Sequence, residues 1–192
     1  MSSIPDFDIN GVLPPFTGTP VAGEARSPYQ VTLTAFVARF ATTPTRRGML
    51  RGLLQLRRAL RAVKITHGFQ WLDGSFLEDV ESHEGREPRD LDVVSYVVPP
   101  DGLSGVAWDL FVRSRLDLFD RQQTKKSFGC DAFYVSLSPL DNRILVRLTA
   151  YWFGLLSHRR DRVWKGFVQV PLDTSDDDQA AWAVLEPSEA SR

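Results

Sequence analysis

The sequence has a single cysteine, Cys130, among its 192 residues. One cysteine cannot form an internal disulfide, so the disulfide framework of a small secreted domain is excluded and the chain is compatible with a reducing compartment. The first residues contain neither a basic n-region nor an apolar h-region, and we therefore expect no secretory signal. No pair of histidines has metal-ligand spacing, and there is no cysteine–histidine array. We expect a cytoplasmic protein.

Long apolar runs and an excess of charge of one sign are also missing. No stretch of about 18 apolar residues occurs, so we expect no transmembrane helix and no membrane partner. The 23 basic and 24 acidic side chains leave a formal net charge of −1. Because no net positive field surrounds the molecule, DNA is not an expected partner, and an RNA contact would need a local basic patch.

The residues that are present are typical of a globular protein, with 43% hydrophobic, 24% charged and 11% aromatic side chains. This composition and length predict one domain. Residues 1–28 are rich in proline and glycine and are expected to form an irregular arm. We expect a single domain over residues 29–173. From about residue 174 the chain becomes acidic and small, which predicts a loose tail over 174–192.

Hydrophobic periodicity predicts alternating helices and strands within this domain. Helices are expected over 30–41, from Pro44 with Thr45 as its cap, over 108–122 and from 138 to 156. Strands are expected over 65–73, 90–98, 130–137 and 165–172. This order predicts an α+β or mixed α/β fold, a small mixed β-sheet with helices packed on one face.

The second predicted helix is basic outside one apolar stripe. The stripe repeats at intervals of three and four residues and consists of Met49, Leu53, Leu56, Leu60 and Val63. The other positions include Arg46, Arg47, Arg51, Arg57, Arg58 and Arg61. They can form a solvated helix face or an RNA-binding surface, and the sequence alone leaves both interpretations open.

One constellation of residues indicates chemistry. Asp90 and Asp92 lie two apart on a predicted strand, so their side chains leave the same face, and Asp131 begins a later strand. Close carboxylates repel one another unless a cation lies between them, and Mg²⁺ prefers such oxygen ligands. Three carboxylates could hold two metal ions, an arrangement suited to in-line phosphoryl or nucleotidyl transfer. Gly74 and Ser75 end the preceding strand, where backbone amides can approach a phosphate.

This order resembles the polymerase-β-like nucleotidyltransferase superfamily, whose pattern is Gly-Ser, a gap, Asp-x-Asp and a third acid on a later strand. The matching segments are LDGSFLEDVESHEGREPRDLDVV and GCDAFYVSL. The resemblance implies that Gly74 and Ser75 bind phosphate and that Asp90, Asp92 and Asp131 are the metal-binding and catalytic triad. This chain departs from the pattern because it has an acidic insert between Ser75 and Asp90.

A narrower likeness covers nearly the whole chain. The segments IPDFDINGVLPP, DGSF with PRDLDVV, and RRDRVWKGFVQVPL are similar to a small bacterial family of uncharacterised, stand-alone nucleotidyltransferase-like proteins. That likeness implies the fold and leaves the substrate open. The chain is too short to include the separate acceptor-binding domain of larger members.

Several basic residues are further candidates for the nucleotide site. Lys126, beside Lys125, precedes the third strand and could meet a triphosphate or remain solvated. Arg160 and Lys165 belong to a basic cluster that could neutralise phosphate, contact an RNA acceptor or cap the preceding helix. We interpret Cys130 as a buried apolar residue, and Trp71, Trp108, Trp152 and Trp164 as core or rim residues.

These features predict an Mg²⁺-dependent nucleotidyltransferase that binds two metal ions and a nucleoside triphosphate. It would transfer the nucleotidyl group to a hydroxyl of RNA, a protein or a small molecule. Two alternatives remain: a binding partner with little turnover in a toxin–antitoxin or defence complex, and an RNA-binding module that uses the basic helix.

Overall fold

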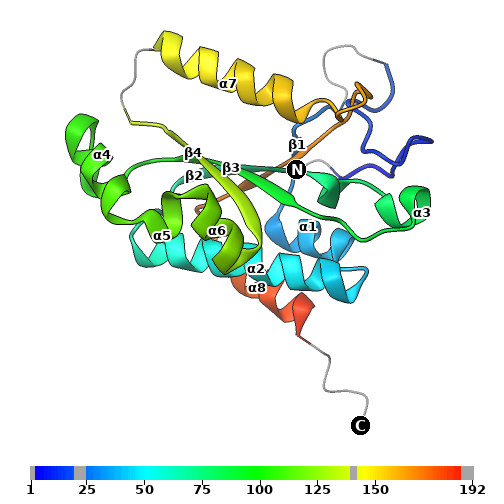
Figure 1. The fold of residues 1–192 in the computed structure, drawn as a ribbon, viewed down its shortest axis with the longest axis horizontal. Helices are drawn as coiled ribbons and strands as arrows, with labels where there is room; N and C mark the ends of the chain where they lie inside the picture. Colours follow the sequence, from blue (N-terminus) through cyan, green and yellow to red (C-terminus); the bar gives the residue numbers. More distant parts are fainter. Residues whose placement is uncertain (1–2, 20–24, 139–141, 187–192) are drawn as a thin grey trace.

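The computed structural model describes residues 3–19, 25–138 and 142–186, and its centre is a five-stranded mixed sheet (Figure 1). The strand order is β1-β5-β2-β3-β4. The strands are β1 (Tyr29–Gln30), β2 (Gly68–Asp73), β3 (Leu91–Val97), β4 (Cys130–Ser136) and β5 (Val168–Pro171). The α+β fold predicted from the sequence is confirmed. The four predicted strands are all present, and β1 is an additional short strand beside β5.

The register of the sheet aligns three aspartates across three strands. β2 is antiparallel to β3 and places Asp73 opposite Asp92. β3 is parallel to β4 and places Asp92 opposite Asp131. Because residues opposite each other project from the same face, all three carboxyl groups lie on one side of the sheet.

Helices cover both faces of the sheet, so the prediction of helices on one face only is wrong in that respect. On one face lie α1 (Leu33–Phe40), α2 (Pro44–Ala62), α5 (Leu116–Phe119), α6 (Arg121–Phe128) and α8 (Ser175–Leu185), while α7 (Asn142–Leu156) crosses the other (Figure 1). The centroid of the Trp152 ring on α7 lies 4.7 Å from the centroid of the Phe133 ring on β4. The remaining helices are the short α3 (Val80–Glu84) and α4 (Gly105–Ser114), and two 3₁₀ turns cover Ser75–Leu77 and Pro100–Gly102.

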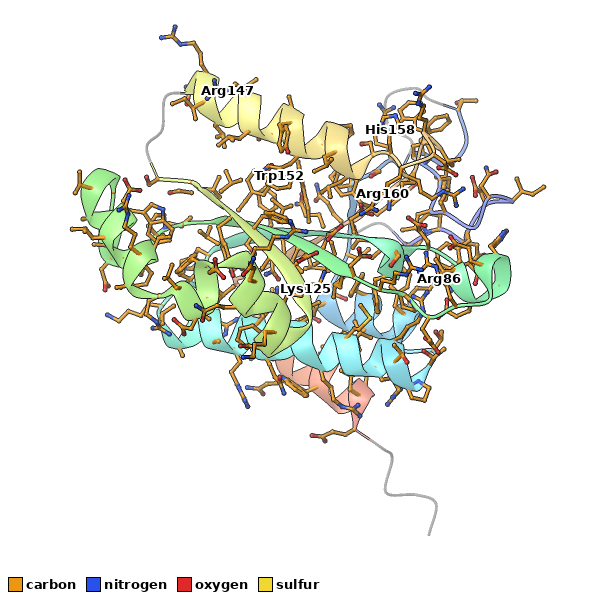
Figure 2. The ribbon with its side chains drawn as sticks, viewed as in Figure 1. Arg86, Lys125, Arg147, Trp152, His158 and Arg160 are labelled. Atoms are coloured by element: carbon orange, nitrogen blue, oxygen red, sulfur yellow. The ribbon has the colours of Figure 1, made fainter. Side chains whose placement is uncertain are left out.

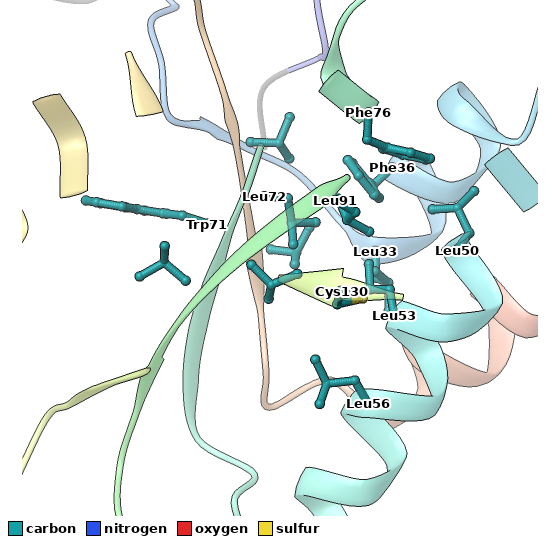
Figure 3. Close-up of a cluster of buried hydrophobic side chains, with 14 of the residues drawn as sticks. Leu33, Phe36, Leu50, Leu53, Leu56, Trp71, Leu72, Phe76, Leu91 and Cys130 are labelled. Carbon is teal, nitrogen blue, oxygen red and sulfur yellow. The ribbon is translucent and has the colours of Figure 1, made fainter. Parts of the chain in front are cut away.

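The hydrophobic core lies between the sheet and the layer of α1 and α2 (Figure 3). Leu53, Leu56 and Leu60 of the predicted stripe are fully buried, and Met49 is half-buried. Cys130 is buried among them, as predicted. The N-cap of α2 lies two residues earlier than predicted, because Thr43 rather than Thr45 accepts the capping hydrogen bond from the Arg46 amide. The core thus fixes the sheet against α2 and leaves its opposite face for the aspartates.

The arginines of α2 bind other parts of the chain instead of forming a continuous exposed basic face. Arg46 is buried and pairs with Glu81, and it also donates to the carbonyl oxygens of Phe76 and Glu78. Arg47 and Arg51 both donate to the Leu185 carbonyl. These contacts are intramolecular, so they favour a structural role for the basic residues over the RNA-binding interpretation.

The C-terminal segment is ordered through Leu185, so the predicted loose tail is wrong for residues 175–185. Its acidic residues are paired: Asp177 accepts hydrogen bonds from the Leu33 and Thr34 amides at the start of α1, and Asp178 pairs with Arg57. Residues 187–192 lie outside the described residues. The described part of the predicted arm is irregular, and its Val12 and Leu13 are fully buried. Within the described ranges, no helix is both long and apolar enough to cross a bilayer.

Candidate functional site

Asp90, Asp92 and Asp131 form one carboxylate cluster, as the sequence predicts. One ligand oxygen from each residue lies within 4.8 Å of those of the other two. Asp92 and Asp131 are opposite one another on β3 and β4, and Asp90 precedes β3 by one residue, on the side of Asp92. The donor set consists of hard carboxylate oxygens only, which is the chemistry that Mg²⁺ prefers, so these three residues could hold the predicted metal.

The Gly74–Ser75 turn supports this cluster directly. The Ser75 amide and hydroxyl both donate to Asp90 Oδ1, at 2.9 and 2.6 Å. The Ser75 oxygen in turn accepts from the Arg89 amide at 2.9 Å. The predicted phosphate-binding serine is therefore hydrogen-bonded to a predicted metal ligand, and the acidic insert leaves the two segments in contact.

Gly74 is required by its conformation and by a close backbone approach. Its φ is +88°, and a Cβ at this position would lie 2.7 Å from the Asp90 carbonyl oxygen. We expect Gly74→Ala to lower the free energy of unfolding by about 1–3 kcal/mol, because strain and the clash add. Gly85→Ala is the matched control, since Gly85 has φ +62° but open space around it. Equal losses of stability in urea unfolding would show that the approach to Asp90 does not matter.

Beneath the turn lies a buried ion cluster that the sequence did not predict. The Lys165 ammonium lies 3.0 Å from Asp73 Oδ1 and 2.8 Å from Glu78 Oε1, and 3.4 Å from the Gly74 carbonyl oxygen. Lys165 and Asp73 are each 4% exposed. Because its charge is committed to two buried carboxylates, Lys165 supports the turn, and its predicted role as a phosphate ligand is corrected.

The electrostatics differ among the carboxylates. Burial, reinforced by the negative charges of Asp90 and Asp131, raises the pKa of Asp92 to about 6. Burial raises the pKa of Asp73 to about 7 despite the Lys165 ammonium. For Asp90 burial acts in the same direction, but the hydrogen bonds from Ser75 outweigh it and the pKa is lowered. Of the three cluster carboxylates, Asp92 is therefore the one whose ionised form is disfavoured in the folded protein.

Replacing Asp92 with a neutral residue should therefore raise the free energy of unfolding. The unfolded carboxyl titrates near 3.8, so the folded protein binds the proton more tightly and loses stability as pH rises from about 4 to 6. Since one pKa unit corresponds to about 1.4 kcal/mol, Asp92→Asn should gain about 1–3 kcal/mol at pH 7.5 without metal. Urea unfolding in a chelator at pH 7.5 and pH 4 measures this gain, which should shrink at pH 4. Asp109→Asn, at an exposed position on α4, should change little, and an equal gain there would contradict a local cause.

Asp131 is held by two cations that the sequence did not assign to it. Arg121 donates from Nε to Oδ1 and from Nη2 to Oδ2, both at 3.1 Å, and the Lys125 ammonium lies 2.9 Å from Oδ2. Burial acts to raise the pKa of Asp131, but these hydrogen bonds and charges outweigh it and the pKa is lowered. The sequence contains a pattern that could have indicated this pairing, because Arg121 and Lys125 are one helical turn apart just before β4 and so lie on the same helix face.

A cleft of about 690 Å³ lies beside the cluster and is lined by residues of the sheet and of α7. Asp73, Asp90 and Asp92 and the Gly74–Ser75 turn form one part of its lining, and Val94, Phe133, Tyr151, Trp152, Leu155 and Leu156 form an apolar part. Figure 2 shows Trp152 on the sheet side of α7 and Arg147 on the opposite side. Trp152 is therefore a cleft residue, and not only the core or rim residue expected from the sequence.

The predicted basic candidates divide at this cleft. Arg160 lines it and is exposed, and Arg86, Arg89, Arg121 and Arg159 also line it. Lys126 is exposed on α6, and neither it nor Lys125 is among the lining residues, so the structure does not support its predicted place in the nucleotide site, whereas Lys125 contacts Asp131. Arg159 is paired with Asp161, and Arg86 with Glu84. Among the predicted basic residues, Arg160 is the one placed to meet an anionic ligand.

A search of curated proteins returned no match, and neither did a search of solved structures. A protein-family model does match, over residues 5–171, which include strands β1 to β5 and Asp73, Asp90, Asp92 and Asp131. The chain therefore belongs to DUF6932, a family of unknown function.

Proposed function

We propose that this protein is an Mg²⁺-dependent nucleotidyltransferase that uses a nucleoside triphosphate and a hydroxyl acceptor. The observation that carries the proposal is the convergence of Asp90, Asp92 and Asp131 within 4.8 Å, beside a glycine–serine turn hydrogen-bonded to Asp90. Three carboxylates this close repel one another, and that repulsion costs stability unless a cation lies among them. The raised pKa of Asp92 indicates such a cost here.

Each residue has a defined part in this proposal. Asp90 and Asp92 would bind both metal ions, and Asp131 one of them. Bound Mg²⁺ would supply the positive charge that stabilises the oxygens during in-line transfer. The acceptor oxygen attacks the α-phosphorus, the bond to the bridging oxygen breaks and pyrophosphate leaves, while Asp131 accepts the hydroxyl proton.

The rest of the cleft fits the rest of such a substrate. Trp152, Tyr151 and Phe133 line its apolar part, and the rings of Phe133 and Trp152 have centroids 4.7 Å apart. Flat aromatic side chains stack on nucleobases largely without regard to sequence. Arg160 lies in the same cleft and would pair with phosphate oxygens. The cytoplasmic location expected from the sequence is part of this proposal.

The test is incubation of the purified protein with each labelled nucleoside triphosphate, Mg²⁺ and a bacterial lysate. The expected result is label in RNA, in protein or in a small molecule, together with release of pyrophosphate. The double variant Asp90→Asn/Asp92→Asn is the matched control and should transfer no label. Absence of label with all four ribonucleotides and all four deoxyribonucleotides would contradict the proposal.

One observation favours a second candidate, a binding partner in a toxin–antitoxin or defence complex. α7 exposes a series of large apolar side chains: Ile144, Val146, Tyr151, Phe153 and Leu155, with exposed fractions between 39% and 68%. Large apolar side chains that are exposed on a helix, such as Val146 outside the cleft, favour an interaction surface. In that case Val146→Asp would abolish complex formation, while the aspartate variants would retain full biological activity.

A further inference from the structure

Arg121 and Lys125 of α6 bind the Asp131 oxygens, which a metal ion held by the carboxylate cluster would also need. Both oxygens of Asp131 accept from Arg121, and Oδ2 also accepts from Lys125. Asp131 is itself 4% exposed, whereas Arg121 and Lys125 are 60% and 52% exposed. The carboxylate is thus fixed on the sheet, and its partners are solvent-facing side chains.

We propose that Arg121 and Lys125 are exchangeable place-holders for the divalent ion, and that metal binding releases them to bind the triphosphate. The inference rests on the proposed function, and it adds two substrate-binding residues to the site. In the metal-free protein they neutralise the carboxylates. After the exchange they supply positive charge for a polyanionic substrate in the same cleft.

The charges and hydrogen bonds at Asp131 favour replacement of the two cations by the metal ion over simultaneous binding of all three. A metal ligated by Asp131 takes at least one oxygen that now accepts from Arg121 or Lys125, and two adjacent cations would repel each other. Arg121 and Lys125 are more than half exposed and regain water when they leave, while the metal ion takes over the neutralisation of the buried Asp131 carboxylate, so the exchange leaves no buried charge unpaired. By contrast Lys165 is 4% exposed and held by two carboxylates, which makes it a fixed charge that cannot exchange.

The Arg121 side chain remains at the substrate cleft when it leaves Asp131. The Arg121 guanidinium lies 5.2 Å from the centroid of the Phe133 ring, and both residues line the cleft. The attraction between a cation and an aromatic face gives the guanidinium a second partner in the cleft when it leaves Asp131. A planar guanidinium also matches phosphate oxygens in bidentate geometry, which gives Arg121 a larger expected contribution than Lys125.

The exchange predicts effects of opposite sign on metal and nucleotide binding. Titration calorimetry with Mn²⁺ alone should show about two- to fivefold tighter binding in Arg121→Ala and Lys125→Ala, since each removes one competing cation. With saturating Mg²⁺, a non-hydrolysable triphosphate analogue should bind roughly tenfold more weakly to the double variant. Arg121→Lys should restore much of the nucleotide affinity. Arg113→Ala, which removes an exposed cation of α4 away from the cleft, should change neither.

The outcomes separate this inference from the proposed function. If the wild-type chain binds Mn²⁺ but the Arg121 and Lys125 variants bind it equally or more weakly, the exchange is wrong while the metal site stands. Unchanged nucleotide affinity in the double variant would likewise overturn the inference. If the wild-type chain binds no Mn²⁺, with or without the analogue, the proposed function fails as well. Thermal unfolding of each variant confirms that folding is intact.

Discussion

Asp90→Asn, Asp92→Asn and Asp131→Asn are each expected to reduce nucleotidyl transfer by about three orders of magnitude or more. Each change removes one negative ligand and keeps the shape of the side chain. A thousandfold loss corresponds to about 4 kcal/mol of transition-state stabilisation, which is within the range that a misplaced metal ion costs. The measurement is transfer of labelled nucleotide under single-turnover conditions, with circular dichroism to confirm the fold.

Ser75→Ala and Asp109→Asn serve as graded controls for this prediction. Ser75→Ala removes the hydroxyl bond to Asp90 but keeps the amide bond, so the loss should be smaller, about tenfold. Asp109 is exposed on α4, and its replacement should leave transfer unchanged. Near-native transfer by Asp131→Asn would contradict its assignment as the third ligand. Asp73, opposite Asp92 in the register, would then be the next residue to test.

Arg57→Met should have the largest effect on stability, lowering the free energy of unfolding by about 3–5 kcal/mol. Arg57 is 2% exposed, and its guanidinium binds Asp178, Gln70 Oε1 at 2.8 Å and the Pro171 carbonyl at 2.9 Å. Its loss removes this partner from Gln70 and from the Pro171 carbonyl, and it leaves Asp178 with the more distant Arg61, at 3.4 Å. Urea unfolding measures the change, and it should coincide with release of α8, which Asp178 anchors.

The neighbouring arginine provides the control. Arg58 is exposed, so Arg58→Met should stay within about 0.5 kcal/mol of wild type. The double variant Arg57→Met/Asp178→Leu should recover part of the loss, because it also removes the half-buried carboxylate that has lost its shorter ion pair. If Arg57→Met were as stable as Arg58→Met, the interpretation of α2 as a helix fixed by its arginines would be wrong.

The sequence predicted those parts of the fold that follow from local periodicity. The four main strands, the apolar stripe of α2 and the shared face of Asp90 and Asp92 all follow from spacings of two, three or four residues. The position of Asp131 beside them also follows, because a third acid at the start of the next strand falls at the same edge of a parallel pair.

The parts that could not be predicted depend on contacts between distant segments. Composition gave α8 the features of a loose tail, but Asp177 and Asp178 are satisfied by α1 and α2, more than 110 residues away. Lys165 was assigned to phosphate because its partners, Asp73 and Glu78, are distant in sequence and buried only in the fold. Hydrophobic periodicity likewise does not specify which face of the sheet α7 covers, because that depends on tertiary packing.

The most direct measurement of the central claim is the anomalous difference density of a crystal of this protein soaked with Mn²⁺ and a non-hydrolysable triphosphate analogue. The account predicts a peak within about 2.2 Å of oxygens from Asp90, Asp92 and Asp131, with the analogue phosphates beside Gly74 and Ser75. It also predicts that Arg121 and Lys125 have left Asp131. An anomalous map without a peak at the cluster, in crystals where the cleft is open to solvent, would contradict it.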